Sequence, residues 1–296
     1  MCSIAVVDVC NHTAFHYAVE QTLKSAIGKN SDGTGKSYES YAKVLTSRKD
    51  DLQALSGNIV VADAFFSNKT FYDALKESGF VLLSRLQKRG KMHYSYIGLQ
   101  KEGRGRKKVY GEKVDVNALD MEHFTCFSDV TKEGVTEKCF GAKVYIDALK
   151  TWAQVVVVQK IDPKTEHIKF THTYFCTDPS LSPQTVLNYY RLRFQIEFLF
   201  RDAKQHLGLT QCQSTDTKVL NNHWNLALTV LNVAKALHHF AKNKQDRKAF
   251  SIADIKDLYI NKLCLNTFIS AFGISPDTEE NYPIIRKLLA WGKKAA

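Results

Sequence analysis

Four residues in the second half of the chain have types and a spacing that allow joint chemistry. The pattern Tyr-x2-Arg-x3-Glu-x6-Lys is formed by Tyr190, Arg193, Glu197 and Lys204. We expect one unbroken helix here, in which all four side chains fall within roughly 60° of arc at about 100° per residue. Arg201 lies close to the same arc. A carboxylate on such a face can hold a metal ion, and the phenol and cations beside it can hold phosphate oxygens.

The residues around this pattern carry a family resemblance. Residues 188–208 are similar to the carboxy-terminal signature of DDE transposases of the insertion-sequence-four type, and all four signature positions are filled. The alternative interpretation is a solvated helix face with ion pairs between side chains four residues apart, such as Arg193 with Glu197. The complete match favours the functional interpretation.

Asp63 is the second candidate for chemistry. It follows an apolar run that we expect to be a strand, and α/β sheets place ligand and metal groups past the carboxyl ends of such strands. From the residues alone, a capping or loop aspartate is the commoner interpretation. The resemblance extends to this segment, because residues 60–71, followed by 82–86, look like the strand that bears the second metal-binding aspartate of these transposases.

The resemblance implies a ribonuclease-H-like catalytic fold in which carboxylates hold two divalent ions about 4 Å apart. It makes Asp63 and Glu197 ligands of Mg²⁺, with Mn²⁺ as a substitute, because carboxylate and phosphate oxygens suit these ions. Tyr190, Arg193 and Lys204 would hold DNA phosphates beside the cleaved bond.

The implied reaction is hydrolysis at a transposon end, followed by transfer of the freed 3′-hydroxyl into target DNA. The implied partners are double-stranded DNA and a second copy of the chain in the transposition complex. The implied location is the bacterial cytoplasm, at the nucleoid when the protein is bound to DNA.

The start of the chain departs from the family pattern. These transposases need a first aspartate on a strand upstream of a hairpin, and we expect residues 3–20 to be the second and third strands, with the first strand absent. Asp8 is the acidic residue that could stand in for the first aspartate, although it lies at the hairpin turn. We therefore expect an amino-terminally truncated transposase with impaired activity. The alternative is a DNA-binding protein without catalysis.

Composition and charge agree with a globular protein that binds a polyanion. The chain has 296 residues, 44% of them hydrophobic, and a formal net charge of +11, which favours nucleic acid as a partner. No apolar run approaches the length of a membrane span. The seven cysteines include no Cys-x2-Cys pair, so neither a zinc site nor a disulfide framework is indicated. Four lie in apolar surroundings and are expected to be buried, reduced thiols: Cys10, Cys139, Cys176 and Cys264.

The hydrophobic pattern predicts an α/β fold with a layered sheet, and the resemblance implies a mixed sheet with flanking helices. A hairpin is expected over 3–20, helices over 37–55 and 67–78, and strands over 58–62 and 80–86. Five more β-rich runs are expected at 91–99, 124–130, 138–147, 152–160 and 167–175. The expected division is a first catalytic part (1–88), a β-rich insertion (89–176), a helical part that completes the domain (177–241) and a helical tail (242–296).

The later helices have clear boundary signals. Ser182 and Pro183 are typical of a helix start, and Gly208 of its end. A second helix is expected over 218–241. Its apolar stripe is formed by Leu226, Val230, Val233 and Leu237.

Two further segments have compositions that suggest ligands. The basic run at 103–108 predicts a phosphate-contacting turn rather than a minor-groove hook, with its cations at Arg104, Arg106, Lys107 and Lys108. Residues 30–37 resemble a phosphate-binding loop, but Asn30 replaces its first glycine and no clear strand precedes it. We therefore expect no nucleotide site there.

Overall fold

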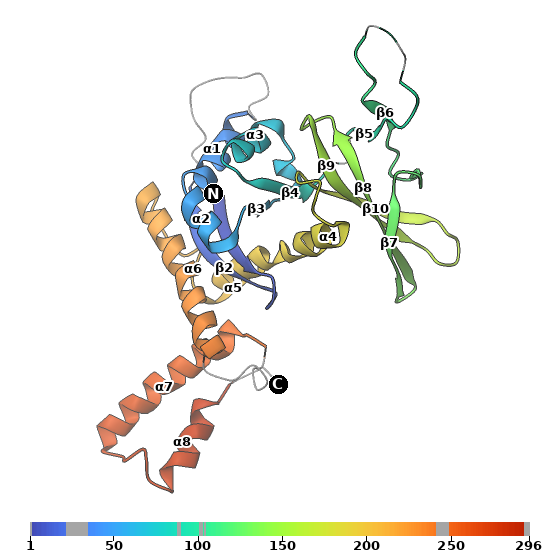
Figure 1. The fold of residues 1–296 in the computed structure, drawn as a ribbon. Coiled ribbons are helices and arrows are strands. Elements are labelled where there is room, and N and C mark those ends of the chain that lie inside the picture. Colours follow the sequence, from blue (N-terminus) through green and yellow to red (C-terminus); the bar gives the residue numbers. More distant parts are fainter. Residues whose placement is uncertain are drawn as a thin grey trace. The chain divides into compact units, whose positions relative to one another are not determined.

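The computed structural model describes residues 2–21, 35–87, 90–100, 103, 105–240 and 249–292, with the side chains of 35–37 left undescribed. The chain divides into two compact units (Figure 1). The first comprises residues 1–2, 6–13 and 22–194, and the second comprises residues 3–5, 14–21 and 195–296. The segment at 30–34 that resembles a phosphate-binding loop lies outside the described residues.

The first unit is built on a mixed sheet with the strand order β3-β4-β10-β9-β8-β5-β6, in which β7 pairs with β8. The strands are β3 (Ile59–Val61), β4 (Val81–Arg85), β5 (Met92–Ser95), β6 (Tyr110–Lys113), β7 (Thr125–Lys132), β8 (Val135–Ile146), β9 (Thr151–Ile161) and β10 (Ile168–Cys176). β3 and β4 are parallel, and the other pairs are antiparallel. The expected mixed α/β class is confirmed. The β-rich segment expected as an insertion shares this sheet with β3 and β4.

β6 is a strand that the sequence pattern does not predict. Gly111 and the charged pair that follows it are poor strand formers. The strand forms because β5 supplies backbone partners, with His93 opposite Lys113 and Ser95 opposite Tyr110. β6 is therefore decided by tertiary pairing and not by local preference.

The core of the first unit lies where helix α4 (Pro183–Leu192) packs on the centre of the sheet. The run Val155–Val158 in β9 is buried on both faces of the sheet, as a continuous apolar run predicts. α4 contributes Val186, Leu187 and Tyr190 to this core. Ser182 accepts a hydrogen bond from the amide of Thr185 at the helix start, which confirms the predicted amino-terminal cap.

Two helices that the sequence predicts as continuous are broken in the structure. The helix expected over 37–55 is two helices, α1 (Gly35–Thr46) and α2 (Lys49–Ser56). The break is at Arg48, whose backbone leaves the helical region at φ −122° and ψ 20°. The Arg48 guanidinium donates to the Val44 carbonyl at 2.8 Å, so a side chain satisfies a helix-end carbonyl.

The expectation of one unbroken helix through the Tyr-Arg-Glu-Lys pattern is also wrong. α4 ends at Leu192 and α5 spans Phe194–His206. The amide of Arg193 bonds to the Tyr190 carbonyl, three residues back instead of four, which tightens the turn between the helices. α5 ends as predicted, because Gly208 has φ +67° and the amide of Leu209 bonds back to Ala203.

The second unit is mostly helical, with α6 (Thr217–Phe240), α7 (Ile252–Phe272) and α8 (Asn281–Leu289). The predicted hairpin is present as β1 (Cys2–Asp8) and β2 (Thr13–Glu20). The expectation that these strands are part of the large sheet is wrong, because they form a separate two-stranded sheet. No helix among the described residues is long and apolar enough to cross a membrane.

Side chains of α6 bond to the backbone of β2 in place of a neighbouring strand. The amide group of Asn225 accepts from the Val19 N–H at 3.0 Å and donates to the Val19 carbonyl at 2.8 Å. Asn232 makes the same pair of bonds with His16, at 2.8 and 2.6 Å. The Lys235 ammonium donates to the Ala14 carbonyl at 2.7 Å. The free edge of β2 is thereby satisfied.

The apolar stripe of α6 and two of the four cysteines expected to be buried are exposed. The apolar stripe of α6 is exposed, by 62% at Leu226 and 52% at Val233, because the polar face of the helix bonds to β2. Cys139 and Cys176 are buried as expected, and burial raises the pKa of both thiols to about 11. Cys10 and Cys264 are exposed, since one lies in the hairpin turn and the other on α7.

Candidate functional site

Asp63 lies two residues beyond β3, at the carboxyl end of the parallel pair β3–β4. It is the amino-terminal cap of a short 3-10 helix, η1 (Ala64–Phe66), and its carboxylate accepts a hydrogen bond from the Ala64 amide. Its carbonyl accepts from the Ser84 hydroxyl at 2.9 Å, which ties the turn to β4. The carboxylate itself is exposed, so the capping role leaves it accessible.

Charged side chains of the same unit, Asp63 among them, act on the Tyr190 phenol. Burial raises the pKa of Tyr190, the charges of Arg193 and Arg85 oppose that rise, and the charge of Asp63 adds to it. A hydrogen bond from Arg193 also stabilises the charged form of the Tyr190 phenol. The Arg193 guanidinium lies 5.9 Å from the centre of the Tyr190 ring. The charges of Asp63, Arg85 and Arg193 therefore all reach the Tyr190 phenol, and Arg85, Tyr190 and Arg193 line one pocket.

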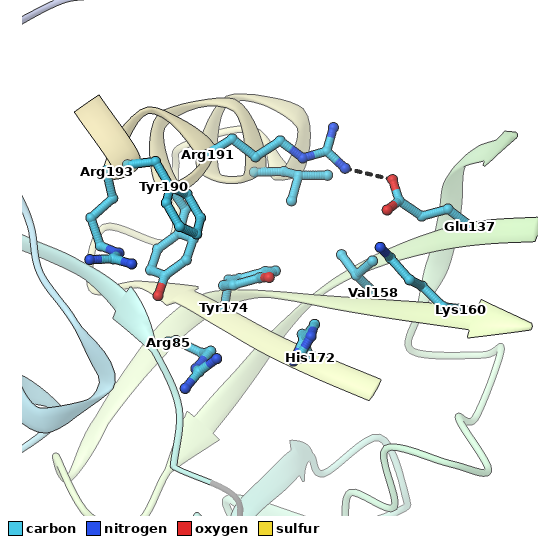
Figure 2. A pocket seen from close by; sticks show the side chains of 11 residues that line it. Arg85, Glu137, Val158, Lys160, His172, Tyr174, Tyr190, Arg191 and Arg193 are labelled. Carbon is cyan, nitrogen blue, oxygen red and sulfur yellow. Dashed lines mark hydrogen bonds and ion pairs between the residues drawn. The ribbon is translucent and has the colours of Figure 1, made fainter. Parts of the chain in front are cut away.

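This pocket of about 350 Å³ lies between the carboxyl-terminal half of α4 and the sheet. Figure 2 shows Tyr174 and Tyr190 against one another in this pocket, and their ring centres are 4.4 Å apart. Burial raises the pKa of Tyr174, so this phenol stays protonated at neutral pH. The remaining polar walls are basic apart from one acid, and they come from Arg85, Lys160, His172, Arg191, Arg193 and Glu137.

The acid in the pocket is already paired. Glu137 accepts from the Arg191 guanidinium at 2.5 Å, as the dashed line in Figure 2 marks. The pairing neutralises Glu137, so the other cations of the pocket set its charge. An anion with a planar or aromatic part fits such walls, since cations bind its charge and tyrosines its flat face.

Several pocket residues do not follow from the sequence pattern. Arg85 lies within the segment 82–86 that resembles the family, but the resemblance alone gives it no role. Lys160, His172 and Tyr174 lie on β9 and β10, before the signature begins. The signal that could indicate them is strand alternation, which puts residues two apart on one face.

The other signature residues lie in the second unit, on α5. Glu197 is in the first turn of α5 and exposed, and Lys204 is exposed in its last turn. Arg201 bonds to the neighbouring Asp202 at 3.0 and 3.1 Å and lies 4.8 Å from the centre of the Phe198 ring. Within α5, Glu197, Arg201 and Lys204 follow one another at the helical intervals of four and three.

The basic run at 103–108 lies in the connection between β5 and β6. Arg106, Lys107 and Lys108 are exposed, and Arg104 lies outside the described residues. The backbone of Lys108 is held by Gln100, which makes bonds of 2.8 and 3.0 Å to its carbonyl and amide. Hydrogen bonds within the β5–β6 connection therefore hold part of the segment that carries these exposed cations.

A model of the transposase DDE domain matches residues 33–233, which is more than half of the chain. The chain belongs to this family. No curated protein matches the chain. The matched range contains Asp63, the pocket and the complete Tyr-Arg-Glu-Lys pattern.

Members of the transposase DDE family depend on divalent metal ions, and the donor chemistry of this DDE domain fits such an ion in part. Asp63 offers an exposed carboxylate that accepts one backbone N–H, and about four lone-pair sites leave room for a metal. Asp8 is engaged by the hairpin turn, where it accepts from the amides of Cys10 and Asn11 at 3.0 Å. Within the described parts of either unit, no three His, Cys, Asp or Glu side chains gather as metal ligands.

Proposed function

We propose that the protein is a DDE transposase of the insertion-sequence-four type, with its catalytic elements in a ribonuclease-H-like arrangement. It cuts double-stranded DNA at transposon ends and joins the freed 3′-hydroxyl to target DNA. The observations that support this proposal best are the position of Asp63 at the carboxyl end of β3 and β4 and the pocket lined by Arg85, Tyr190 and Arg193. They supply a carboxylate suited to a metal and side chains suited to phosphate.

Asp63 and Glu197 would hold Mg²⁺, or Mn²⁺ in its place, because these ions prefer carboxylate oxygens. The bound metal would activate the attacking oxygen and stabilise the leaving oxygen. We expect the two carboxylates to lie within about 8 Å of each other in the active protein. A crystal structure with Mn²⁺ and DNA measures that separation, and carboxylates facing opposite sides of the sheet would contradict the assignment.

The chain's own cations and phenols would position the DNA. Tyr190 keeps its proton at neutral pH because burial raises its pKa, so its hydroxyl can donate a hydrogen bond to a phosphate oxygen. Arg85 and Arg193 supply fixed positive charge next to it, and Lys204 adds a third cation from α5. Such positioning lowers the barrier of phosphoryl transfer by holding the reacting oxygens in line.

The test of catalysis is nicking of supercoiled plasmid DNA with Mg²⁺ or Mn²⁺. We expect Asp63→Asn and Glu197→Gln each to reduce the nicking rate by at least about 100-fold, since each removes a metal ligand. Asp277→Asn is the matched control, because Asp277 is an exposed acid in the second unit. Nicking that survives both substitutions would contradict the proposed ligands.

The second candidate function is DNA binding without catalysis, and the net charge of +11 favours DNA binding in either case. Both functions predict duplex binding that weakens steeply between low and physiological salt. Binding without metal-dependent nicking supports the second candidate, while binding that does not depend on salt contradicts both. Under the first proposal, we expect the protein to assemble as a homodimer on paired DNA ends in the cytoplasm.

A further inference from the structure

A second group of aromatic side chains lies on the sheet outside the pocket. The rings of Tyr110 and Tyr145 have centres 4.4 Å apart, and Trp152 lies 5.5 Å from Tyr145 and 6.2 Å from Tyr110. All three residues are half-buried. We call Tyr110, Tyr145 and Trp152 the aromatic platform.

The strand register puts the platform on the same face of the sheet as the pocket. Tyr145 pairs with Trp152 across β8 and β9, and Glu137 pairs with Lys160 further along the same two strands. These positions are separated by an even number of residues, so their side chains share one face. Gly141 lies between them on β8, and its Cα faces Pro183 at the start of α4. The helix therefore crosses this face, with the pocket and the platform at opposite ends of β8.

The surroundings of the platform are basic. Lys113 pairs with His93 on the neighbouring strand, and the charge of Arg106 acts on the Tyr145 phenol. Lys143 is exposed on the same face of β8, two residues before Tyr145. One acid, Asp147, also lies near the platform: it is 3.2 Å from His93, and its charge acts on the Tyr145 phenol as that of Arg106 does.

The Tyr145 phenol of the platform stays neutral across the physiological pH range. A hydrogen bond with Tyr110, and then burial, raises the pKa of Tyr145 to about 12. A neutral ring does not repel a phosphate chain. Exposed aromatic faces beside cations are the arrangement by which proteins hold single-stranded nucleic acid, because bases stack on rings and phosphates lie on Lys and Arg.

We propose that the aromatic platform binds unpaired nucleotides of single-stranded DNA, with their bases stacked on Tyr110 and Trp152 and their phosphates on Arg106, Lys113 and Lys143. Duplex DNA fits less well, since its bases are stacked on one another and do not expose their faces. The platform is a second contact surface that goes beyond the proposed cleavage site. The proposal for the platform does not depend on whether the protein cuts DNA.

The test uses Trp152 as the reporter. The chain has three tryptophans, and the substitutions Trp224→Phe and Trp291→Phe in the full chain leave only Trp152. Titration with a thymidine oligonucleotide should quench its fluorescence, because a stacked base contacts the indole. An abasic oligonucleotide of the same length has the same phosphates, so we expect at least roughly 5-fold weaker binding and little quenching.

Tyr110→Leu should weaken binding of the thymidine oligonucleotide by roughly 5-fold or more. Tyr110 is on the edge strand β6, and circular dichroism checks that the variant is folded. The matched control is Tyr282→Leu, since Tyr282 is an exposed tyrosine on α8. Lys113→Gln should reduce the salt dependence of binding, and Lys287→Gln on α8 should change it less.

Equal affinity for the abasic and thymidine oligonucleotides would overturn the proposal, because the phosphates alone would then explain binding. No effect of Tyr110→Leu on single-strand binding in a folded variant would overturn it too. Loss of nicking in Glu197→Gln tests the proposed function separately. The platform variants are not expected to abolish metal-dependent nicking, so the two proposals can fail independently.

Discussion

Helices α4 and α6 contact strands in opposite ways. α4 packs on the large sheet through apolar side chains, with Val186 and Leu187 fully buried against β9 and β10. α6 contacts β2 through amides, with Asn225 and Asn232 bonded to the strand backbone. Apolar packing covers the face of a sheet, whereas directional bonds complete the edge of one. A helix that completes an edge thus turns its polar face inward and leaves its apolar stripe exposed.

The largest expected effect tests the apolar contact. Leu187→Ala should destabilise the first unit by about 2–5 kcal/mol, because it leaves a cavity in the core under α4. Leu226→Ala on the exposed stripe of α6 is the matched control and should change stability by about 0.5 kcal/mol or less. Urea unfolding followed by circular dichroism measures both. Equal losses would contradict the difference drawn between the two helices.

The amide contact is tested by Asn225→Ala. The change leaves the N–H and carbonyl of Val19 without their partner, so we expect a loss of about 1–3 kcal/mol in the free energy of unfolding. Asn222→Ala is the control, because Asn222 is exposed on the same helix and the change in helix preference is identical. If both variants lose the same amount, the bonds to β2 contribute nothing beyond helix preference.

The contact between Gly141 on β8 and Pro183 at the start of α4 provides a further test of how tightly α4 packs on the sheet. A Cβ atom at Gly141 would lie 2.5 Å from Cγ of Pro183, so Gly141→Ala should cost about 1–3 kcal/mol by overpacking. The double variant Gly141→Ala with Pro183→Ala removes the clashing ring. A double-mutant cycle in thermal unfolding should therefore show recovery of part of the loss, and strictly additive losses would show that the contact is not tight.

The contact of α6 with β2 also predicts a pH dependence of stability. Burial lowers the pKa of Lys235 to about 8, from 10.5 for an ordinary lysine. Between these two pH values the unfolded chain binds more protons than the folded chain, so this residue makes stability rise with pH. We expect the stability difference between the protein and Lys235→Met to shift in the protein's favour from pH 8 to 10.5. A difference that is flat over this interval would show that Lys235 is solvated.

The candidate site could be predicted from the sequence only where its residues are close along the chain. Tyr190, Arg193 and Glu197 follow a spacing that can be recognised directly, and Asp63 follows a recognisable strand. Arg85 and Tyr174 could not be assigned to the pocket, because their place depends on β4 and β10 pairing as neighbours. The break at Arg193 was also hidden, since every residue around it is compatible with a helix.

The sequence by itself determined the elements with strong local signals. These elements are the apolar strand β9, the start of α4 at Ser182 and Pro183, and the hairpin at the start of the chain. Their physical basis is local, because alternation, capping and turn preferences act within a few residues.

Only the tertiary structure decided which face or edge of each helix or strand contacts the rest of the chain. The apolar stripe of α6 has the spacing of a core face, yet its asparagines complete β2 and leave that stripe in solvent. β6 forms from residues with weak strand preference because β5 offers it a backbone to pair with. An edge strand with unbonded N–H and carbonyl groups is costly, and partners from distant parts of the chain remove that cost. Such partners cannot be identified from local sequence.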